Sequence, residues 1–147
     1  MLVSFIGLGA NYEDKKEKII MAITQSMKNL EIYNIAISLM ENFKDELNLP
    51  VKVNFYLQKN MTAIVEMAQE IDKTRKEIIE KFGTPVEEGS DEITVAPENL
   101  DAANKELTDL FELEQDVKIY PIKLDWFGDI NFSSQQVAAI TYMIEEE

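Results

Sequence analysis

The chain contains neither cysteine nor histidine. Without cysteine, the sequence excludes disulfides, thiolate nucleophiles and cysteine-ligated metals. Without histidine, it excludes Ser-His-Asp triads and ordinary zinc sites, because histidine is the usual general base near neutral pH and the commonest metal ligand. Any catalysis would need carboxylates, lysine, tyrosine or a metal held by oxygen atoms. We therefore expect a protein that is not an enzyme and that uses no cofactor and no metal.

Long apolar runs are also missing, since no stretch approaches the roughly 20 residues of a membrane-spanning helix. Residues 1–10 lack the basic flank of a secretory signal, and charged residues follow from Glu13 onward. A chain of 147 residues with 46% hydrophobic content is long enough for one domain with a core of its own. The sequence predicts a soluble, cytoplasmic protein that does not contact membranes.

Basic residues are scarce and unevenly distributed. The formal net charge is −14: residues 83–147 carry 3 basic and 16 acidic side chains, whereas residues 1–82 carry 11 basic and 12 acidic ones. An acidic field repels nucleic-acid phosphates and anionic membranes, and it favours solubility or a basic partner. We expect no direct binding to nucleic acid.

Apolar residues recur at helical spacing over most of residues 11–82. Pro50 suits the first turn of a second helix and Gly83 ends it, although alternation from Val51 to Leu57 leaves a short strand as the alternative. Two long helices joined at residues 48–50 would form an antiparallel hairpin. The first apolar stripe is Met27, Leu30, Tyr33, Ile37, Met40, Phe43 and Leu47, and the second is Leu57, Met61, Ile64, Ala68, Ile71, Arg75, Ile78 and Phe82.

The remaining residues predict shorter elements. Glu92–Val95 favours a strand, and Pro97 opens a helix with an apolar stripe. Alternation over Val117–Trp126 changes phase at Pro121, which indicates a bulge or an edge strand. A capping box at residues 133–136 starts a closing helix. The stripe after Pro97 is Leu100, Ala103, Leu107, Leu110 and Phe111, and the closing helix is expected to bury Val137, Ile140, Thr141 and Ile144.

These patterns predict a mainly α fold with a small β element (α+β), in which a long antiparallel helical hairpin carries a small mixed α/β cap. Residues 27–83 would form the hairpin, and residues 84–147 the acidic cap, packed with the hairpin as one domain.

The opening run Phe5-Ile6-Gly7-Leu8-Gly9-Ala10 is typical of a strand that enters a dinucleotide-binding turn. The third glycine of that fingerprint is replaced by Tyr12, and residues 30–50 look helical where a second strand is required. The run therefore favours a structural lead-in over a cofactor site. The acidic clusters around Gly89 and before Val117 likewise do not match the ligand spacing of a calcium loop.

Four residues are candidates for binding a partner. Arg75, the only arginine, falls at a seam position, where it either extends to solvent, pairs with a neighbouring carboxylate or anchors a partner's carboxylate or phosphate. Trp126 and Phe127, with Tyr120 nearby, either cover the core or form an aromatic patch of the kind that dominates interfaces.

Apolar residues outside the two stripes, such as Ile32, Leu39, Val65 and Ile79, widen the apolar helix surface beyond what two helices bury. Either the cap or another subunit must cover them.

The order of features resembles a family of short uncharacterised proteins of tailed bacteriophages of Gram-positive hosts. The likeness covers about residues 27–146. It therefore implies that residues 1–26 are an N-terminal extension, with a short strand and the start of a helix. Its marks are Met27-Lys28-Asn29-Leu30-Glu31-Ile32, Leu49-Pro50-Val51-Lys52, the helix end from Arg75 to Gly83, Pro97-Glu98-Asn99, Val117-Lys118-Ile119 and Ile130-Asn131-Phe132-Ser133-Ser134. The resemblance implies a non-secreted phage protein of the host cytoplasm or the virion, and it brings no activity and no catalytic residue.

From the sequence we expect a non-enzymatic interaction protein, either a virion component or an assembly factor. It would bury its surplus apolar helix surface against copies of itself or another phage protein. The alternative is an inhibitor of a host protein. Its acidic half would imitate the charge of nucleic acid and bind in a basic groove of that host protein.

Overall fold

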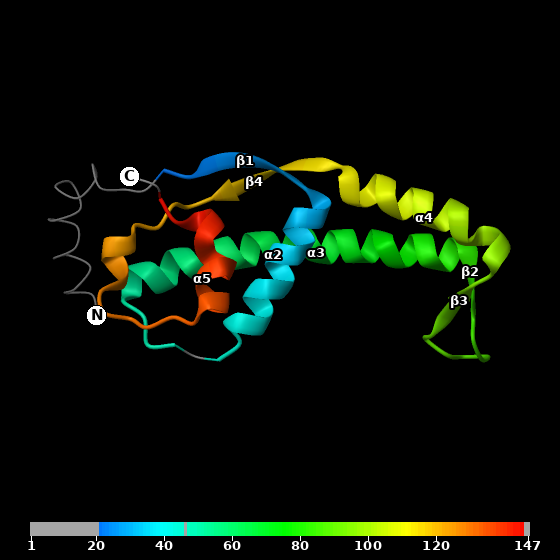
Figure 1. Cartoon of the computed structure of the whole chain (residues 1–147), viewed down its shortest axis with the longest axis horizontal. Helices are drawn as coiled ribbons and strands as arrows, with labels where there is room; N and C mark the ends of the chain where they lie inside the picture. Colours follow the sequence, from blue (N-terminus) through cyan, green and yellow to red (C-terminus); the bar gives the residue numbers. More distant parts are fainter. Residues whose placement is uncertain (1–20, 46, 146–147) are drawn as a thin grey trace, which may run out of the picture.

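The computed structural model describes residues 21–45 and 47–145, and within them the fold is mainly helical with two small antiparallel sheets, as predicted (Figure 1). The run containing Gly7 and Gly9 lies outside the described residues. The elements, in chain order, are β1 (Ile23–Lys28), α2 (Asn29–Asn42), α3 (Val51–Phe82), β2 (Gly83–Pro85), β3 (Ile93–Val95), α4 (Pro97–Glu112), β4 (Glu114–Ile119), the 3-10 helix η2 (Leu124–Phe127), α5 (Ser134–Ile140) and the 3-10 helix η3 (Thr141–Met143).

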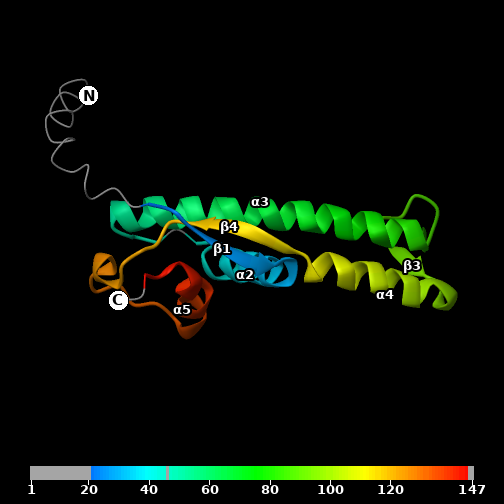
Figure 2. The ribbon, with the colours of Figure 1, turned by 90° about the horizontal axis from the view of Figure 1, so that it is seen from above.

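Helix α3 is the longest of the described helices. Its 32 residues extend over about 48 Å, with Pro50 as the residue that precedes the helix, so the helical interpretation of residues 51–57 is confirmed. Its first two thirds bury one face and its last third runs beside α4 (Figure 2). The buried residues are Val53, Leu57, Asn60, Ile64, Ala68 and Ile71, four of which belong to the predicted seam.

Helix α2 is shorter than predicted and crosses α3 obliquely (Figure 1). Its predicted stripe began at Met27, but Met27 lies in β1, because residues 23–28 pair with β4. At its other end the helix stops at Asn42. There Gln136 of α5 donates a hydrogen bond of 3.1 Å to the Asn42 carbonyl and Phe43 packs edge-on against Phe132. The connection to α3 therefore spans residues 43–50, longer than expected.

Strands β1 and β4 form one antiparallel pair, with Ile23 opposite Ile119 and Lys28 opposite Glu114. The ladder spans residues 23–28, so the expected boundary between residues 26 and 27 falls inside a continuous strand. Buried Asn29 supports the same junction, because its side chain donates to the Leu110 carbonyl at 2.8 Å and accepts from the Gln115 amide at 2.7 Å.

Strands β2 and β3 form a second antiparallel hairpin at the far end of α3 (Figure 2). The strand predicted over residues 92–95 is confirmed as Ile93–Val95, and Gly89 adopts a φ of 80° in the turn between the strands. Positive φ favours glycine, because a side chain would clash with its own backbone there.

The C-terminal segment confirms the capping box, since Ser133 and Gln136 exchange both hydrogen bonds. Its inward face differs from the prediction: the segment buries Ala139, Ile140 and Met143, whereas Val137 and Thr141 are exposed. The switch to a 3-10 helix after Ile140 accounts for the change at Thr141 and Met143. Val137 and Ala139 precede that switch, and there α5 buries a different side from the one predicted. Ile122, beyond Pro121, pairs in parallel with Ile144.

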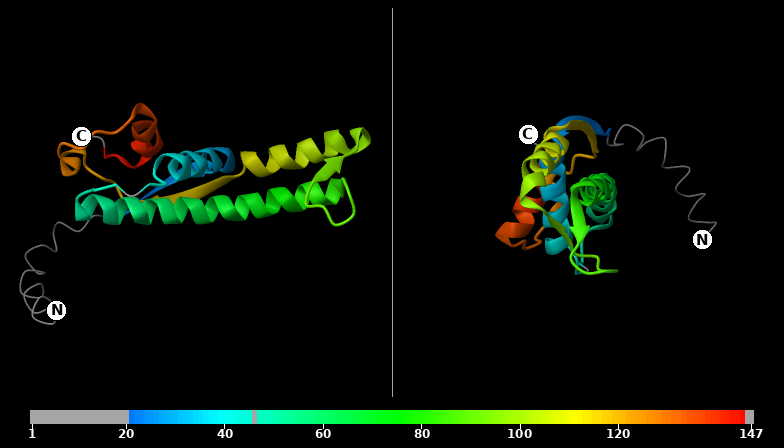
Figure 3. Two further views of the ribbon diagram at one scale, coloured as in Figure 1. Left: turned by 90° about the horizontal axis from the view of Figure 1, so that it is seen from below. Right: turned by 90° about the vertical axis from the view of Figure 1, so that its right-hand side faces the viewer.

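Burial is concentrated in one half of the molecule. The core cluster joins α2, the first two thirds of α3, β4 and the C-terminal helices. The other half, which we call the arm, comprises residues 72–113: the end of α3, the β2–β3 hairpin and α4 (Figure 3). In the arm only Ala103 is buried. Among the described residues, no helix combines the length and apolarity that crossing a membrane requires.

Candidate partner-binding site

The end of strand β4 is held in place by one side chain of α3. Asn60, which is buried, donates from Nδ2 to the Tyr120 carbonyl at 2.9 Å and accepts at Oδ1 from the Tyr120 backbone N–H at 2.7 Å. Its carboxamide therefore replaces the backbone partner that β4 loses beyond Ile119. This pairing fixes where the Tyr120 ring projects.

Four aromatic rings gather where β4 leaves the sheet. Tyr56 stacks on Tyr120 with ring centroids 5.8 Å apart, lies 6.4 Å from Trp126, and meets Phe55 edge-on at 5.2 Å. Tyr56, Tyr120 and Trp126 are half-buried, whereas Phe55 is 53% exposed. The rings thus form a partly solvent-facing row rather than a closed core.

Three lysines lie over these rings. The Nζ of Lys52 is 3.9 Å from the Trp126 ring centroid, that of Lys59 is 4.6 Å from Tyr120 and 5.2 Å from Phe55, and that of Lys118 is 5.5 Å from Tyr120. Ammonium groups at such distances are attracted to the negative faces of aromatic rings. The rings therefore hold positive charge together on the surface of an acidic protein.

The same lysines act on the Tyr120 hydroxyl. A hydrogen bond with the Lys118 side chain is the largest influence, Lys59 adds to it, and together they lower the pKa of Tyr120 below its ordinary value of 10.0. The direction of the pKa shift follows from the positive charge of these two ammonium groups beside the hydroxyl.

A groove of about 570 Å³ opens beside these residues between α3 and the end of β4. We call it the lysine–aromatic groove. Apolar and aromatic surface alternates in it with two ammonium groups, and Glu66 is the one acidic residue in its lining. Its lining includes Phe55, Lys59, Ala63, Lys118 and Tyr120.

The structure brings together two of the four predicted site residues. Tyr120 and Trp126 meet through Tyr56. Phe127 is 6% exposed and packs edge-on against Phe132 at 5.4 Å, so it belongs to the core.

Arg75 lies on α3, about 22 Å along the helix from Asn60. There its Nε and Nη2 each lie 2.9 Å from Oδ1 of Asp72. Lys76 adds a contact of 3.1 Å to the other oxygen, and the Tyr33 hydroxyl donates to Oδ1 at 3.2 Å. Partial burial alone would raise the pKa of Asp72, but the hydrogen bonds and charges of Arg75 and Lys76 outweigh it and lower the pKa below 3.8. Arg75 is engaged within its own helix.

Sequence reasoning missed Tyr56, Lys59 and Asn60. The signal for Asn60 was its place three residues after Leu57 and four before Ile64, which puts a polar residue on the buried stripe. Lys59 and Tyr56 carried no comparable signal, because their relation to Tyr120 depends on how β4 crosses α3.

A second groove runs along the outer side of α4. Its volume is about 350 Å³, and Leu30 of α2 joins Leu107 and Phe111 of α4 in lining it. Lys28 and Glu112 form an ion pair of 3.8 Å there. Leu100, 43% exposed, lies two turns before Leu107 on the same side of the helix. We call Leu30, Leu100, Leu107 and Phe111 the α4 outer face.

In the described part of the chain, no group of three or more acidic residues is arranged to hold a metal ion. Comparisons of the chain with protein-family models, with curated proteins and with solved structures found no match in any of the three. Its function must therefore be argued from its own residues.

Proposed function

We propose that this chain is a non-enzymatic protein–protein interaction protein that binds through the α4 outer face. The observation that supports it is the contrast in burial. The arm, residues 72–113, buries only Ala103, although it contains Ile78, Phe82, Leu107 and other large apolar residues. Two helices side by side cover one seam and leave the remaining apolar surface to another molecule.

The apolar stripe of α4 is wider than the seam that the helix forms with α3. Ala103 and Leu110 form the edge of the stripe that faces α3 and the core, whereas Leu100 and Leu107 form the other edge, about 60° further round the helix. The outer side is continuous with Leu30 of α2, so it forms one surface built from two elements. Such a surface suits an apolar helix that would add a third member to the arm.

The resemblance to short phage proteins gives this surface a biological setting. In that setting the protein acts in the host cytoplasm or in the particle as a virion component or assembly factor. Its partner is another copy of itself or another phage protein. The alternative, inhibition of a basic host protein, draws on the acidic half, residues 83–147. Within it, residues 83–104 contain six acidic residues, all exposed, and no basic one.

The test is association at high salt. At about 1 M salt charges are screened beyond about 3 Å, whereas apolar contacts persist. We expect self-association by sedimentation, or co-purification with phage particles, to survive in high salt for the wild type and to be lost in the Leu30→Glu/Leu100→Glu variant. Both side chains are at least 43% exposed, so the variant should fold.

The matched control is Val137→Glu, which places the same charge on an apolar residue that is 49% exposed on α5. It should associate like the wild type. A wild type that is monomeric at high salt and captures no phage protein would overturn the proposal. Capture of a basic host protein that fails between low and moderate salt would support the charge-mimicry alternative instead.

A further inference from the structure

The lysine–aromatic groove has the chemistry of a site for an acidic segment. A carboxylate at the Tyr120 hydroxyl edge would meet the ammonium groups of Lys59 and Lys118, both of which already lie over the Tyr120 ring. The exposed Phe55 ring at the side of the groove offers apolar contact area. An occupant therefore needs at least two carboxylates and an apolar side chain in a short, compact stretch.

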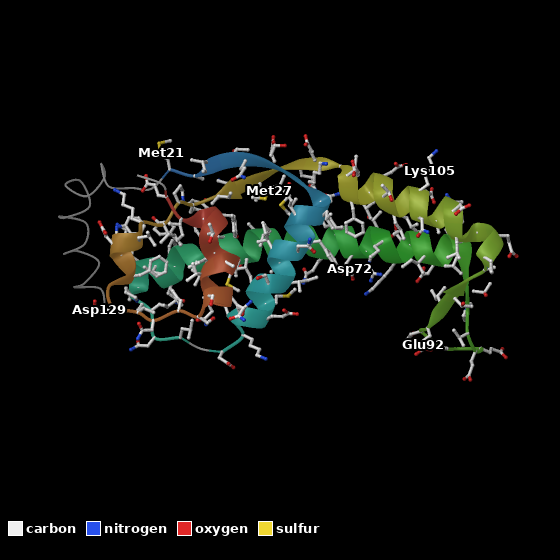
Figure 4. The ribbon with its side chains drawn as sticks, in the orientation of Figure 1. Met21, Met27, Asp72, Glu92, Lys105 and Asp129 are labelled. Atoms are coloured by element: carbon white, nitrogen blue, oxygen red, sulfur yellow. The ribbon has the colours of Figure 1, made fainter. Side chains whose placement is uncertain are left out.

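The turn between β2 and β3 of this chain has that composition. Glu87, Glu88, Asp91 and Glu92 are all exposed there, and Val86 beside them is 54% exposed. Figure 4 shows Glu92 at the tip, away from the helices. We call residues 86–92 the acidic tip.

The acidic tip is already folded as a turn. The Val86 N–H donates to the Glu92 carbonyl at 2.9 Å, and the Ser90 N–H donates to the Glu87 carbonyl at 3.0 Å. A segment that is ordered before it binds loses less conformational entropy on binding than a flexible one.

The tip and the groove lie at opposite ends of the molecule. Lys59 and Gly83 are 24 residues apart along α3, which corresponds to about 36 Å. Figures 1 and 2 show the β2–β3 hairpin at one end of α3 and the end of β4 near the other. The acidic tip therefore cannot reach the groove of its own chain.

Because of this separation, one end of the molecule carries the acidic tip and the other carries the lysines of the groove. Contacts between like ends of two copies bring like charges together, whereas contact between unlike ends brings the acidic tip against the lysines. At about 0.15 M salt the Debye length is about 8 Å, so charges elsewhere on two elongated copies are screened from each other while the contact pairs still attract.

We propose that the lysine–aromatic groove binds the acidic tip of a second copy, so that copies associate head to tail. Such a contact is heterologous: it joins the groove of one copy to the tip of the next, so a pair of copies keeps one groove and one tip free. Repetition therefore gives an open filament, or a ring if the rotation closes. The surfaces are distinct from the α4 outer face, and the inference does not depend on the function proposed above.

The experiment uses the full chain carrying Leu30→Glu/Leu100→Glu, which removes association through the α4 outer face. Sedimentation at about 0.15 M salt should show concentration-dependent association that disappears at about 1 M salt. In this background the groove variant Lys59→Gln/Lys118→Gln and the tip variant Glu87→Gln/Glu88→Gln should each weaken association at least roughly tenfold.

Mixing the two variants gives the decisive result. The groove variant still has an intact tip and the tip variant an intact groove, so an equimolar mixture should form a discrete dimer and nothing larger. The control Lys73→Gln/Lys105→Gln neutralises two exposed lysines elsewhere on α3 and α4 and should associate like its parent; Figure 4 shows that Lys105 points away from α3.

Three outcomes would overturn the inference. One is a parent chain that is monomeric at about 0.15 M salt, and another is a mixture of the two variants that stays monomeric. The third is binding of a single-stranded oligonucleotide that the groove variant loses, without self-association of the parent, because the groove would then serve phosphates and bases. Loss of the high-salt association alone would contradict only the function proposed for the α4 outer face.

Discussion

Asn60 and Tyr120 lie 60 residues apart in the chain, yet the side chain of one completes the backbone hydrogen bonding of the other. The Asn60 carboxamide bonds both the N–H and the carbonyl of Tyr120, at 2.7 and 2.9 Å. An asparagine amide presents an N–H donor and an oxygen acceptor on the same edge, as the N–H and C=O of one residue in a neighbouring antiparallel strand do. The register of β4 on α3, and with it the position of the Tyr120 ring, follows from this pair.

We expect Asn60→Ala to lower the free energy of unfolding by about 1–3 kcal/mol, because two backbone groups of Tyr120 lose their partners and a buried void remains. Denaturant unfolding measures the change. Asn104→Ala, at an exposed position of α4, is the control and should stay within about 0.5 kcal/mol of the wild type. If Asn60→Ala is as stable as the control, the pairing does not hold β4.

The course of α3 was the most predictable part of the fold. Its apolar residues repeat at helical spacing between Pro50 and Gly83, and such local signals do not depend on the rest of the chain. Strand β1 was missed for the opposite reason. The pairing of Ile23–Lys28 with β4 joins residues about 90 positions apart, and a helical stripe that runs through Met27 gives no hint of it.

The hydroxyl of Tyr142 is buried and has no hydrogen-bond partner in the described structure. An unsatisfied buried hydroxyl costs the free energy of its dehydration. We therefore expect Tyr142→Phe to leave the free energy of unfolding unchanged at pH 7 or to raise it by up to about 1 kcal/mol. Tyr33→Phe, which loses the bond to Asp72, is the contrasting variant and should lose about 0.5–1.5 kcal/mol.

Burial raises the pKa of Tyr142 well above its ordinary value of 10.0, which adds a dependence on alkaline pH. Above pH 10 the unfolded chain releases this proton while the folded chain keeps it, so stability falls as the pH rises. Tyr142→Phe removes that loss, and its advantage over the wild type should grow between pH 9 and pH 11. A constant difference over this range would show that the ring is solvated.

Asp72 connects α2 to the base of the arm, since it accepts from Tyr33 on α2 and pairs with Arg75 and Lys76. Its pKa is lower in the folded than in the unfolded chain, so the pairing stabilises the fold above pH 3.8 and is lost as the pH falls through the lower folded value. Because these side chains are partly exposed, Asp72→Asn should lower the free energy of unfolding at pH 7 by only about 0.3–1 kcal/mol.

The difference between Asp72→Asn and the wild type should shrink between pH 4 and pH 2, where the wild-type carboxylate is itself protonated. Urea unfolding at several pH values follows it. Glu77→Gln removes an exposed charge five residues away and should match the wild type throughout. A deficit of Asp72→Asn that is the same at pH 2 as at pH 7 would mean that the carboxylate charge is not what stabilises this contact.

Of the candidate site, only the aromatic residues Tyr120 and Trp126 could be predicted from the sequence. Tyr120 and Trp126 stand out in a chain with one tryptophan, and aromatic residues near a proline suggest a surface turn. The lysines were not predictable, because Lys52 and Lys59 belong to a helix with many other polar residues. Only the crossing of β4 over α3 places them above the same rings as Lys118.

Gly83 ends α3 at a place where no side chain fits. Its φ of −116° is open to any residue, so conformational freedom is not what requires glycine. A Cβ atom at this position would instead overlap Cγ2 of Ile93 and would lie 2.8 Å from the Ile79 carbonyl oxygen. The β2–β3 hairpin can therefore pack against the end of α3 only because residue 83 lacks a side chain.

We expect Gly83→Ala to destabilise the hairpin by about 1–3 kcal/mol through this overlap, which hydrogen exchange of the β2–β3 amides would detect as faster exchange. The overlap also predicts non-additivity. Ile93→Ala removes the clashing methyl group, so the double variant should lose less than the sum of the two single losses. Additive losses would place the strain in the backbone.

Because this hairpin carries the acidic tip, Gly83→Ala should also weaken head-to-tail association. Thr84→Ala, at the exposed neighbouring residue, should leave both the stability of the hairpin and the association unchanged.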